Sequence, residues 1–120
     1  MKIGVALNQP GVRDTIALAE RVESLGYHGA WLTSGGGVDS IPMLAAIAQR
    51  TSRVRLGTSV VQALPRHPVV LAQEGHVIAQ LAPGRLRLGI GPSHRPLMES
   101  FGLPFEFAGD TPATPLTASE

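Results

Sequence analysis

The sequence predicts an α/β protein in which parallel strands alternate with helices. Short apolar segments begin near residues 3, 29, 54 and 86, and the stretches between them carry apolar residues at helical spacing. The resulting period of roughly 25 to 32 residues is typical of alternating parallel βα units. Neither an all-β nor an all-α arrangement accounts for this alternation.

Composition narrows the classes of function. The 120 residues permit one domain with one sizeable core. Lys and Arg number 10 against 9 Asp and Glu, and only 4% of residues are aromatic, so we expect no nucleic-acid partner. The absence of cysteine excludes disulfides, zinc-thiolate sites and thiol nucleophiles. No segment has the pattern of a signal peptide or a membrane span, so we expect a cytoplasmic protein with no membrane partner.

The first strand, helix and second strand follow in order. Residues 3–7 form a nearly unbroken apolar run, which suits a strand covered on both faces. Asp14 is the expected N-cap of the first helix, and Gly26 is expected to end it. Residues 30–32 are the second strand, and a glycine-rich loop follows them. Together these segments form one strand, helix, strand unit.

The second half of the sequence repeats this pattern. Asp39 or Ser40 is expected to cap the second helix. The β-branched stretch 54–61 is the third strand, His67 opens the third helix, and residues 86–90 are the fourth strand.

The composition changes near the end of the chain. Beyond residue 107, Pro, Thr, Gly and Ala replace the large apolar residues that could build a core. We therefore expect one domain over residues 1–107 and a disordered Pro- and Thr-rich tail over residues 108–120.

The alternation of strands and helices alone fits a doubly wound sheet and a barrel equally well, and sequence motifs decide between these two folds. LAAIA at 44–48 and RLGTSVV at 55–61 resemble the second helix and third strand of the luciferase-like monooxygenase family. PRHP at 65–68 and GRLRLGIG at 84–91 follow in the order and spacing of that family's third helix and fourth strand. The resemblance extends over roughly residues 2–107 and implies a partial TIM (β/α)₈ barrel, a half-barrel of about four parallel βα units.

The resemblance also implies an activity. Members of the family hold a flavin-type ring at the C-terminal mouth of the barrel and catalyse hydride transfer or monooxygenation. Residues Gly91 to Pro96 resemble the branch that uses coenzyme F-420, a 5-deazaflavin, and FMN is the alternative coenzyme. We therefore expect a flavin- or deazaflavin-dependent oxidoreductase with a small-molecule substrate.

Two strand ends are expected to contact the coenzyme. Relatives carry a bulge with a non-prolyl cis peptide against the ring, which here would lie at Ser59-Val60, next to Thr58. The alternative is an ordinary buried strand. Ser34 stands where many relatives place an acidic residue. Its hydroxyl can hydrogen-bond a ring or substrate but cannot serve as a general base at neutral pH.

The exit of the fourth strand supplies the expected catalytic residue. Gly91 and Ser93 are small enough for a ring to approach closely, and His94 has an imidazole that titrates near neutrality and can move a proton. The alternative is a loop histidine in solvent. The four histidines show no paired ligand spacing, so we expect no metal site. Outside the site, we expect Trp31 to pack in the core and Arg85 to pair with a carboxylate.

Four strands are half of what barrel closure requires. A half-barrel leaves two sheet edges with unpaired backbone groups and an apolar inner face. We therefore expect a truncated family member, and we expect a homodimer that completes a barrel as its stable form. The competing class is a non-catalytic fragment or interaction module of a luciferase-like barrel.

Overall fold

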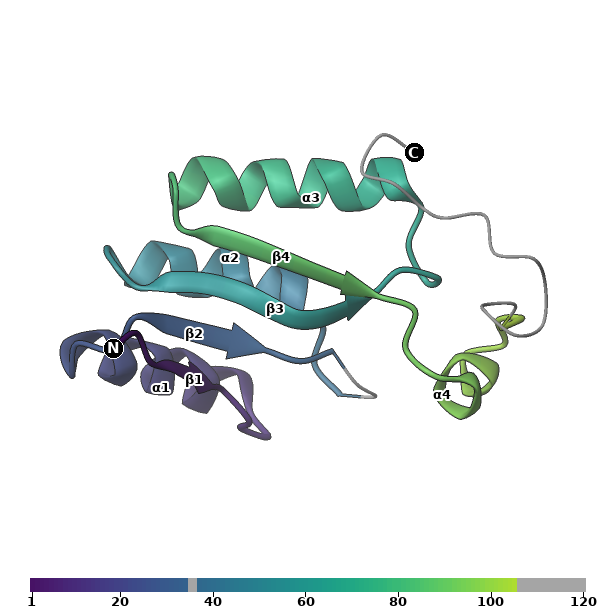
Figure 1. The fold of residues 1–120 in the computed structure, drawn as a ribbon, viewed down its shortest axis with the longest axis horizontal. Helices are drawn as coiled ribbons and strands as arrows, with labels where there is room; N and C mark the ends of the chain where they lie inside the picture. Colours follow the sequence, from purple (N-terminus) through teal and green to yellow (C-terminus); the bar gives the residue numbers. More distant parts are fainter. Residues whose placement is uncertain (35–36, 106–120) are drawn as a thin grey trace.

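The computed structural model describes residues 1–34 and 37–105, and it shows four parallel strands alternating with helices (Figure 1). The elements are β1 (Gly4–Ala6), α1 (Val12–Ser24), β2 (Gly29–Leu32), α2 (Ser40–Arg50), β3 (Arg55–Gln62), α3 (Pro68–Leu81), β4 (Leu86–Gly91) and α4 (Arg95–Ser100). The strand order is β1-β2-β3-β4, and every neighbouring pair is parallel. This confirms the alternating βα architecture. The expected tail at 108–120 lies outside the described residues.

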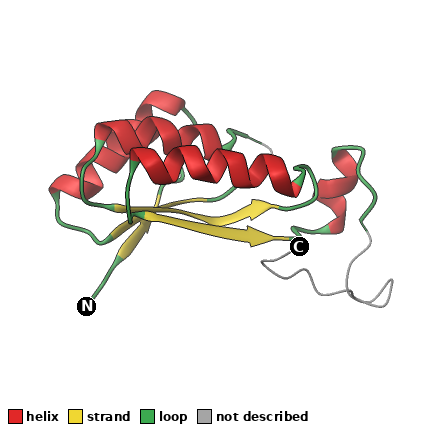
Figure 2. Cartoon of the chain, turned by 90° about the horizontal axis from the view of Figure 1, so that it is seen from above, coloured by secondary structure: helices red, strands yellow, loops and turns green. Residues whose placement is uncertain are grey.

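The sheet has one covered face and one open face. Figure 2 shows α1, α2 and α3 lying together on one side of the four strands, with no helix on the other side. We call the open side the inner face, because it corresponds to the inside of a barrel. In the described part of the chain, no helix is long and apolar enough to cross a membrane.

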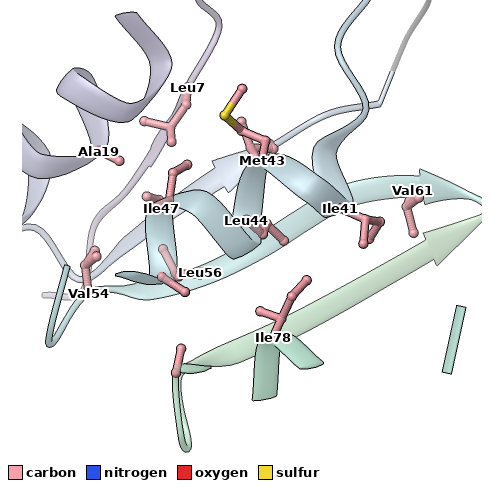
Figure 3. Close-up of a cluster of buried hydrophobic side chains, with 14 of the residues drawn as sticks. Leu7, Ala19, Ile41, Met43, Leu44, Ile47, Val54, Leu56, Val61 and Ile78 are labelled. Carbon is pink, nitrogen blue, oxygen red and sulfur yellow. The ribbon is translucent and has the colours of Figure 1, made fainter. Parts of the chain in front are cut away.

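The core lies between the sheet and the three helices (Figure 3). Leu44 and Ile47 on α2 and Leu56 on β3 are fully buried, and Ile78 brings α3 onto the same cluster. Burying a side chain of this size contributes about 1.5–3 kcal/mol. This apolar layer therefore holds the helices against the strands and positions the strand ends.

β1 departs from expectation. A strand covered on both faces was predicted, but Gly4 and Ala6 are exposed and Ile3 just before them is 48% exposed. That prediction was wrong, because β1 is an edge strand whose inner face is open.

The helix starts are partly as predicted. Asp39 caps α2, where its carboxylate accepts from the Ile41 N–H at 3.1 Å. His67 caps α3, as expected. For α1 the expectation was wrong: Gly11 is the N-cap, and Asp14 lies inside the first turn, where a negative charge complements the helix dipole.

β3 and β4 are paired with an irregularity. The register shifts between Thr58 and Val61, so that Ser59 and Val60 together face the single residue Gly89. The Ser59-Val60 peptide is cis, at the position predicted from the sequence. Beyond β4, the short helix α4 was not predicted.

Two polar residues fasten the amino ends of the strands. The Glu23 carboxylate accepts from the backbone N–H groups of Ser52, Arg53 and Val54 at 2.7–3.1 Å. Arg85 was expected to pair with a carboxylate, and this was wrong. Its guanidinium donates instead to the Val54 carbonyl at 3.0 Å and to the hydroxyl and carbonyl of Thr51. The nearby carboxylate of Glu23 is instead occupied by hydrogen bonds from the backbone N–H groups of the same loop.

Candidate functional site

The inner face is hollowed near the carboxyl ends of the strands. This hollow has a volume of about 480 Å³. Its lining comes from β1, β2, β3 and the residue after β2, namely Gly4, Ala6, Trp31, Thr33, Thr58, Ser59 and Val60. The lining is apolar apart from a few hydroxyl groups, and its volume lies within the usual range for a small-molecule site.

Trp31 forms the floor of the hollow. A Cβ added at Gly4 would lie 2.4 Å from its Nε1, and one added at Gly57 would lie 2.1 Å from its Cζ3. The indole therefore lies flat across β1 and β3. The prediction that Trp31 packs in the core was wrong, because strand alternation sends its neighbours Ala30 and Leu32 into the core and leaves Trp31 on the inner face.

The bulge presents Ser59 and Val60 to the hollow. Both are exposed, with Val60 40% exposed. Thr58 is buried, and its hydroxyl donates to the Gly89 carbonyl at 2.7 Å. A Cβ at Gly89 would lie 2.4 Å from the Thr58 carbonyl oxygen, and one at Gly91 would lie 2.7 Å from a Val60 methyl. The absence of side chains at Gly89 and Gly91 on β4 therefore leaves space for the bulge of β3.

Ser34 lies beside the hollow without lining it. Its hydroxyl is hydrogen-bonded to the hydroxyl of buried Ser40, and its carbonyl accepts from the Gln62 amide at 2.6 Å. Its backbone N–H donates to the Val60 carbonyl at 3.2 Å. Ser34 thus ties the end of β2 to α2 and β3, and Thr33 is the residue that lines the hollow. The sequence analysis chose Ser34 rather than Thr33 at this strand end, although Thr33 follows Trp31 by two residues and alternation puts both on one face.

The exit of β4 lies apart from the hollow. Gly91, Ser93 and His94 are absent from its lining. Ser93 has a φ of 65°, and its hydroxyl lies 3.3 Å from the exposed His94 imidazole. Of the residues predicted to form the site, the structure brings together Thr58, Ser59 and Val60, and Gly91 lies against the Val60 side chain.

A second hollow of about 430 Å³ lies between the ends of β1 and β2 and the helices α1 and α2. It is lined by Leu7, Asn8, Gln9, Pro10, Thr15, Leu32, Thr33, Gly37, Val38, Ser40 and Met43. Thr33 lines both hollows. Among residues 1–34 and 37–105, no titratable side chain lines either one. These surfaces can therefore hold and orient a flat, largely apolar ligand, and proton transfer needs a group from outside them.

Charged groups near the strand ends are paired. Arg66, in the loop after β3, donates to both Glu74 carboxylate oxygens at 3.0 and 2.9 Å and to Asp39 with its other arm. Burial opposes the charge of Arg66, but the two carboxylates outweigh it and raise the pKa of the guanidinium. Within residues 1–34 and 37–105, no three His, Asp or Glu side chains converge as metal ligands.

The fold and the site define a class of protein: a parallel βα sheet with a ligand-sized hollow at the carboxyl ends of its strands, as in barrel enzymes. The sequence profile of the luciferase-like monooxygenases matches residues 1–111, and the chain belongs to this family.

Two relatives support the family assignment, and a solved structure supports the fold. The chain is 37% identical over 93 residues to the F420-dependent glucose-6-phosphate dehydrogenase of Kribbella flavida, covering 69% of this chain and 28% of that protein. It is 38% identical over 82 residues to the 4-hydroxyprotoasukamycin monooxygenase of Streptomyces nodosus subsp. asukaensis, covering 63% and 22%. The F420-dependent tetrahydromethanopterin reductase of Methanopyrus kandleri superposes with a TM-score of 0.76 at 23% identity, covering 89% of this chain and 31% of that one. The chain thus spans about a quarter to a third of these proteins.

Proposed function

We propose that this chain forms the part of a luciferase-like oxidoreductase that backs the ring of a flavin-type coenzyme. Coenzyme F-420 is the first candidate, because a relative 37% identical is named as F420-dependent, and FMN is the alternative. A deazaflavin supplies hydride transfer, and a flavin supplies hydride transfer or oxygenation. The substrate class that fits is a small molecule.

One observation carries this proposal. The bulge of β3 directs Ser59 and Val60 toward the hollow, and the flat indole of Trp31 forms the floor of that hollow. A planar ring needs broad apolar contact and a few polar groups that orient it. Val60 and Trp31 offer the first, and the hydroxyls of Ser59 and Thr33 offer the second.

The remaining predicted residues do not line this hollow, and we assign them other roles. Gly91 leaves space for Val60, and Ser34 holds the end of β2 through Ser40. Ser93 and His94 follow β4, where the exposed imidazole can give or take a proton as the substrate reacts. His94 is the proposed catalytic residue. In any preparation that turns over, His94→Gln should slow turnover by about a hundredfold while coenzyme affinity stays unchanged.

A binding titration tests the proposal. The purified chain is titrated with coenzyme F-420, with FMN in parallel, and both coenzyme fluorescence and the emission of Trp31, the sole tryptophan, are followed. We expect saturable binding of F-420 that quenches Trp31. Val60→Asp should abolish binding, whereas Val69→Asp, at a 57% exposed valine on the outer side of α3, should not. Absence of binding by either coenzyme would favour the interaction-module alternative, which the open edges at β1 and β4 support.

A further inference from the structure

The second hollow is a pocket of its own, with a wall made of core residues. Leu7, Leu32 and Met43 line it and are 3%, 6% and 4% exposed. Strand alternation directs Leu32 to the opposite face of β2 from Trp31, the floor of the hollow on the inner face. Its volume of about 430 Å³ suits a small organic molecule. The packed core therefore holds a ligand-sized space on the helix side of β2.

A pair of serine hydroxyls can donate a hydrogen bond into this space. Ser40 lines the second hollow and is 2% exposed, and its hydroxyl is hydrogen-bonded to that of Ser34. Two hydroxyl groups carry two protons, and the bond between them uses only one. Among residues 1–34 and 37–105, no further acceptor bonds either hydroxyl. The pair therefore has one proton left to donate.

An acceptor atom in the second hollow would use that proton. Ser34 would then donate to Ser40, and Ser40 would donate to the ligand. The other buried hydroxyl of the lining is that of Thr15, 3% exposed, and it already donates to the Gly11 carbonyl at 2.7 Å. Ser40 is thus the buried donor that a ligand oxygen would meet.

The lining is uncharged within the part of the chain that the structure describes. Its polar members carry hydroxyl or amide groups, including the exposed amides of Asn8 and Gln9. The nearby carboxylate of Asp39 is engaged elsewhere, because it accepts from the Ile41 N–H and pairs with Arg66. Transfer of a charged group from water into a pocket without a counter-charge is strongly unfavourable. The second hollow therefore favours an uncharged ligand over an ion of the same shape.

We propose that the second hollow binds an uncharged organic molecule through a carbonyl or other acceptor oxygen that takes the Ser40 proton. Thr33 lines both hollows, so a ligand here lies beside whatever occupies the hollow on the inner face. This makes the ligand the substrate, or part of it, and only this last assignment rests on the proposed coenzyme site.

Three probes of nearly one shape test the binding: benzamide, which is neutral and has a carbonyl oxygen, benzoate, and benzamidinium. Each is titrated at pH 7 into the isotope-labelled chain without coenzyme, and nuclear magnetic resonance follows the signals of Thr15, Ser40 and Met43. Benzamide should shift these signals saturably, and each ion should bind at least about tenfold more weakly. The proposal is overturned if benzamide leaves these signals in place, or if either ion binds as tightly.

A variant tests the hydrogen bond itself. Ser40→Ala removes the donor and should weaken benzamide binding by about tenfold. Ser24→Ala is the matched control, because this exposed hydroxyl at the end of α1 lies outside the second hollow, and affinity should stay unchanged. Equal affinity in the unaltered chain and a folded Ser40→Ala variant would refute the role of Ser40. If circular dichroism shows that variant to be unfolded, the three probes on the unaltered chain decide.

The outcome is independent of the coenzyme titration. A chain that binds benzamide but neither coenzyme would keep this site and refute the proposed function. A chain that binds a coenzyme but not benzamide would keep the proposed function and refute this site.

Discussion

The Trp31 indole lies directly on Gly57, so close that a β-carbon there would lie 2.1 Å from the ring. The same β-carbon would lie 2.6 Å from the Arg87 carbonyl oxygen, which is backbone and cannot turn away. The missing side chain of Gly57 therefore matters in two ways. It leaves room for the Trp31 indole to lie against β3, and it allows β3 and β4 to pair closely at this position.

Gly57→Ala should lower the free energy of unfolding by about 1–3 kcal/mol, because ring and backbone must both shift to admit the methyl group. Urea unfolding followed by circular dichroism measures the change. Gly75→Ala is the matched control. A Cβ there meets only a Leu88 methyl at 3.6 Å, and alanine favours the helix, so stability should hold or rise by about 0.5–1 kcal/mol. Equal losses in both variants would contradict the close seating of Trp31.

Glu23 should make stability depend on pH in the acid range. Burial opposes its ionisation, but hydrogen bonds from Val54, Arg53 and Ser52 outweigh this and hold the pKa of the carboxyl below the ordinary glutamate value of 4.5. The carboxylate therefore stabilises the fold above pH 4.5, and this contribution disappears as the pH falls through the lowered pKa.

Glu23→Gln should accordingly cost about 1 kcal/mol at pH 7 and flatten the pH dependence of unfolding below pH 4.5. Thermal unfolding between pH 3 and 7 measures both effects. The control is Glu20→Gln, since Glu20 and Arg50 form an exposed pair at 3.5 Å that should contribute little. A Glu23→Gln variant with an unchanged pH profile would contradict the role of the carboxylate.

Arg66→Lys should destabilise the loop between β3 and α3. The guanidinium bridges Asp39 and Glu74 and is only 18% exposed, and an ammonium group cannot make the same forked contacts. We expect a loss of about 1–2 kcal/mol in urea unfolding. Arg50→Lys, at a 63% exposed side chain, should change stability by less than about 0.5 kcal/mol. Equal effects at both positions would show that the bridge contributes nothing of its own.

Substitutions at Thr33 and Ser34 should affect different properties, with Thr33 affecting coenzyme affinity and Ser34 affecting the stability of the fold. Thr33 lines the hollow, whereas the Ser34 hydroxyl is hydrogen-bonded to Ser40. If the proposed coenzyme site is correct, Thr33→Val should weaken coenzyme affinity by about fivefold, the value of one hydrogen bond. Ser34→Ala should leave affinity within about twofold and lower the unfolding temperature instead. If Ser34→Ala weakened coenzyme affinity and Thr33→Val did not, the result would indicate that Ser34, and not Thr33, contacts the coenzyme.

Several features of fold and site could be predicted from residues that are close in sequence. The alternation of apolar segments predicts the four strands, and Asp39 and His67 cap their helices through atoms two residues away. The RLGTSVV segment predicts where β3 is irregular, because its resemblance to the family lies within one continuous strand. Each of these features depends on local backbone geometry or on a contiguous motif.

Other features depend on segments about 30 residues apart. Arg85 donates to the carbonyls of Thr51 and Val54 only because the register of β3 and β4 brings the segments before these two strands together. Trp31 and Thr33 face the hollow because pairing of β1 to β4 decides which side of each strand lies inward. The sequence alone determined which segments become strands and helices and which family they resemble. Only the tertiary structure decided which side chains share the inner face, because facing and register are settled by pairing between strands and not within them.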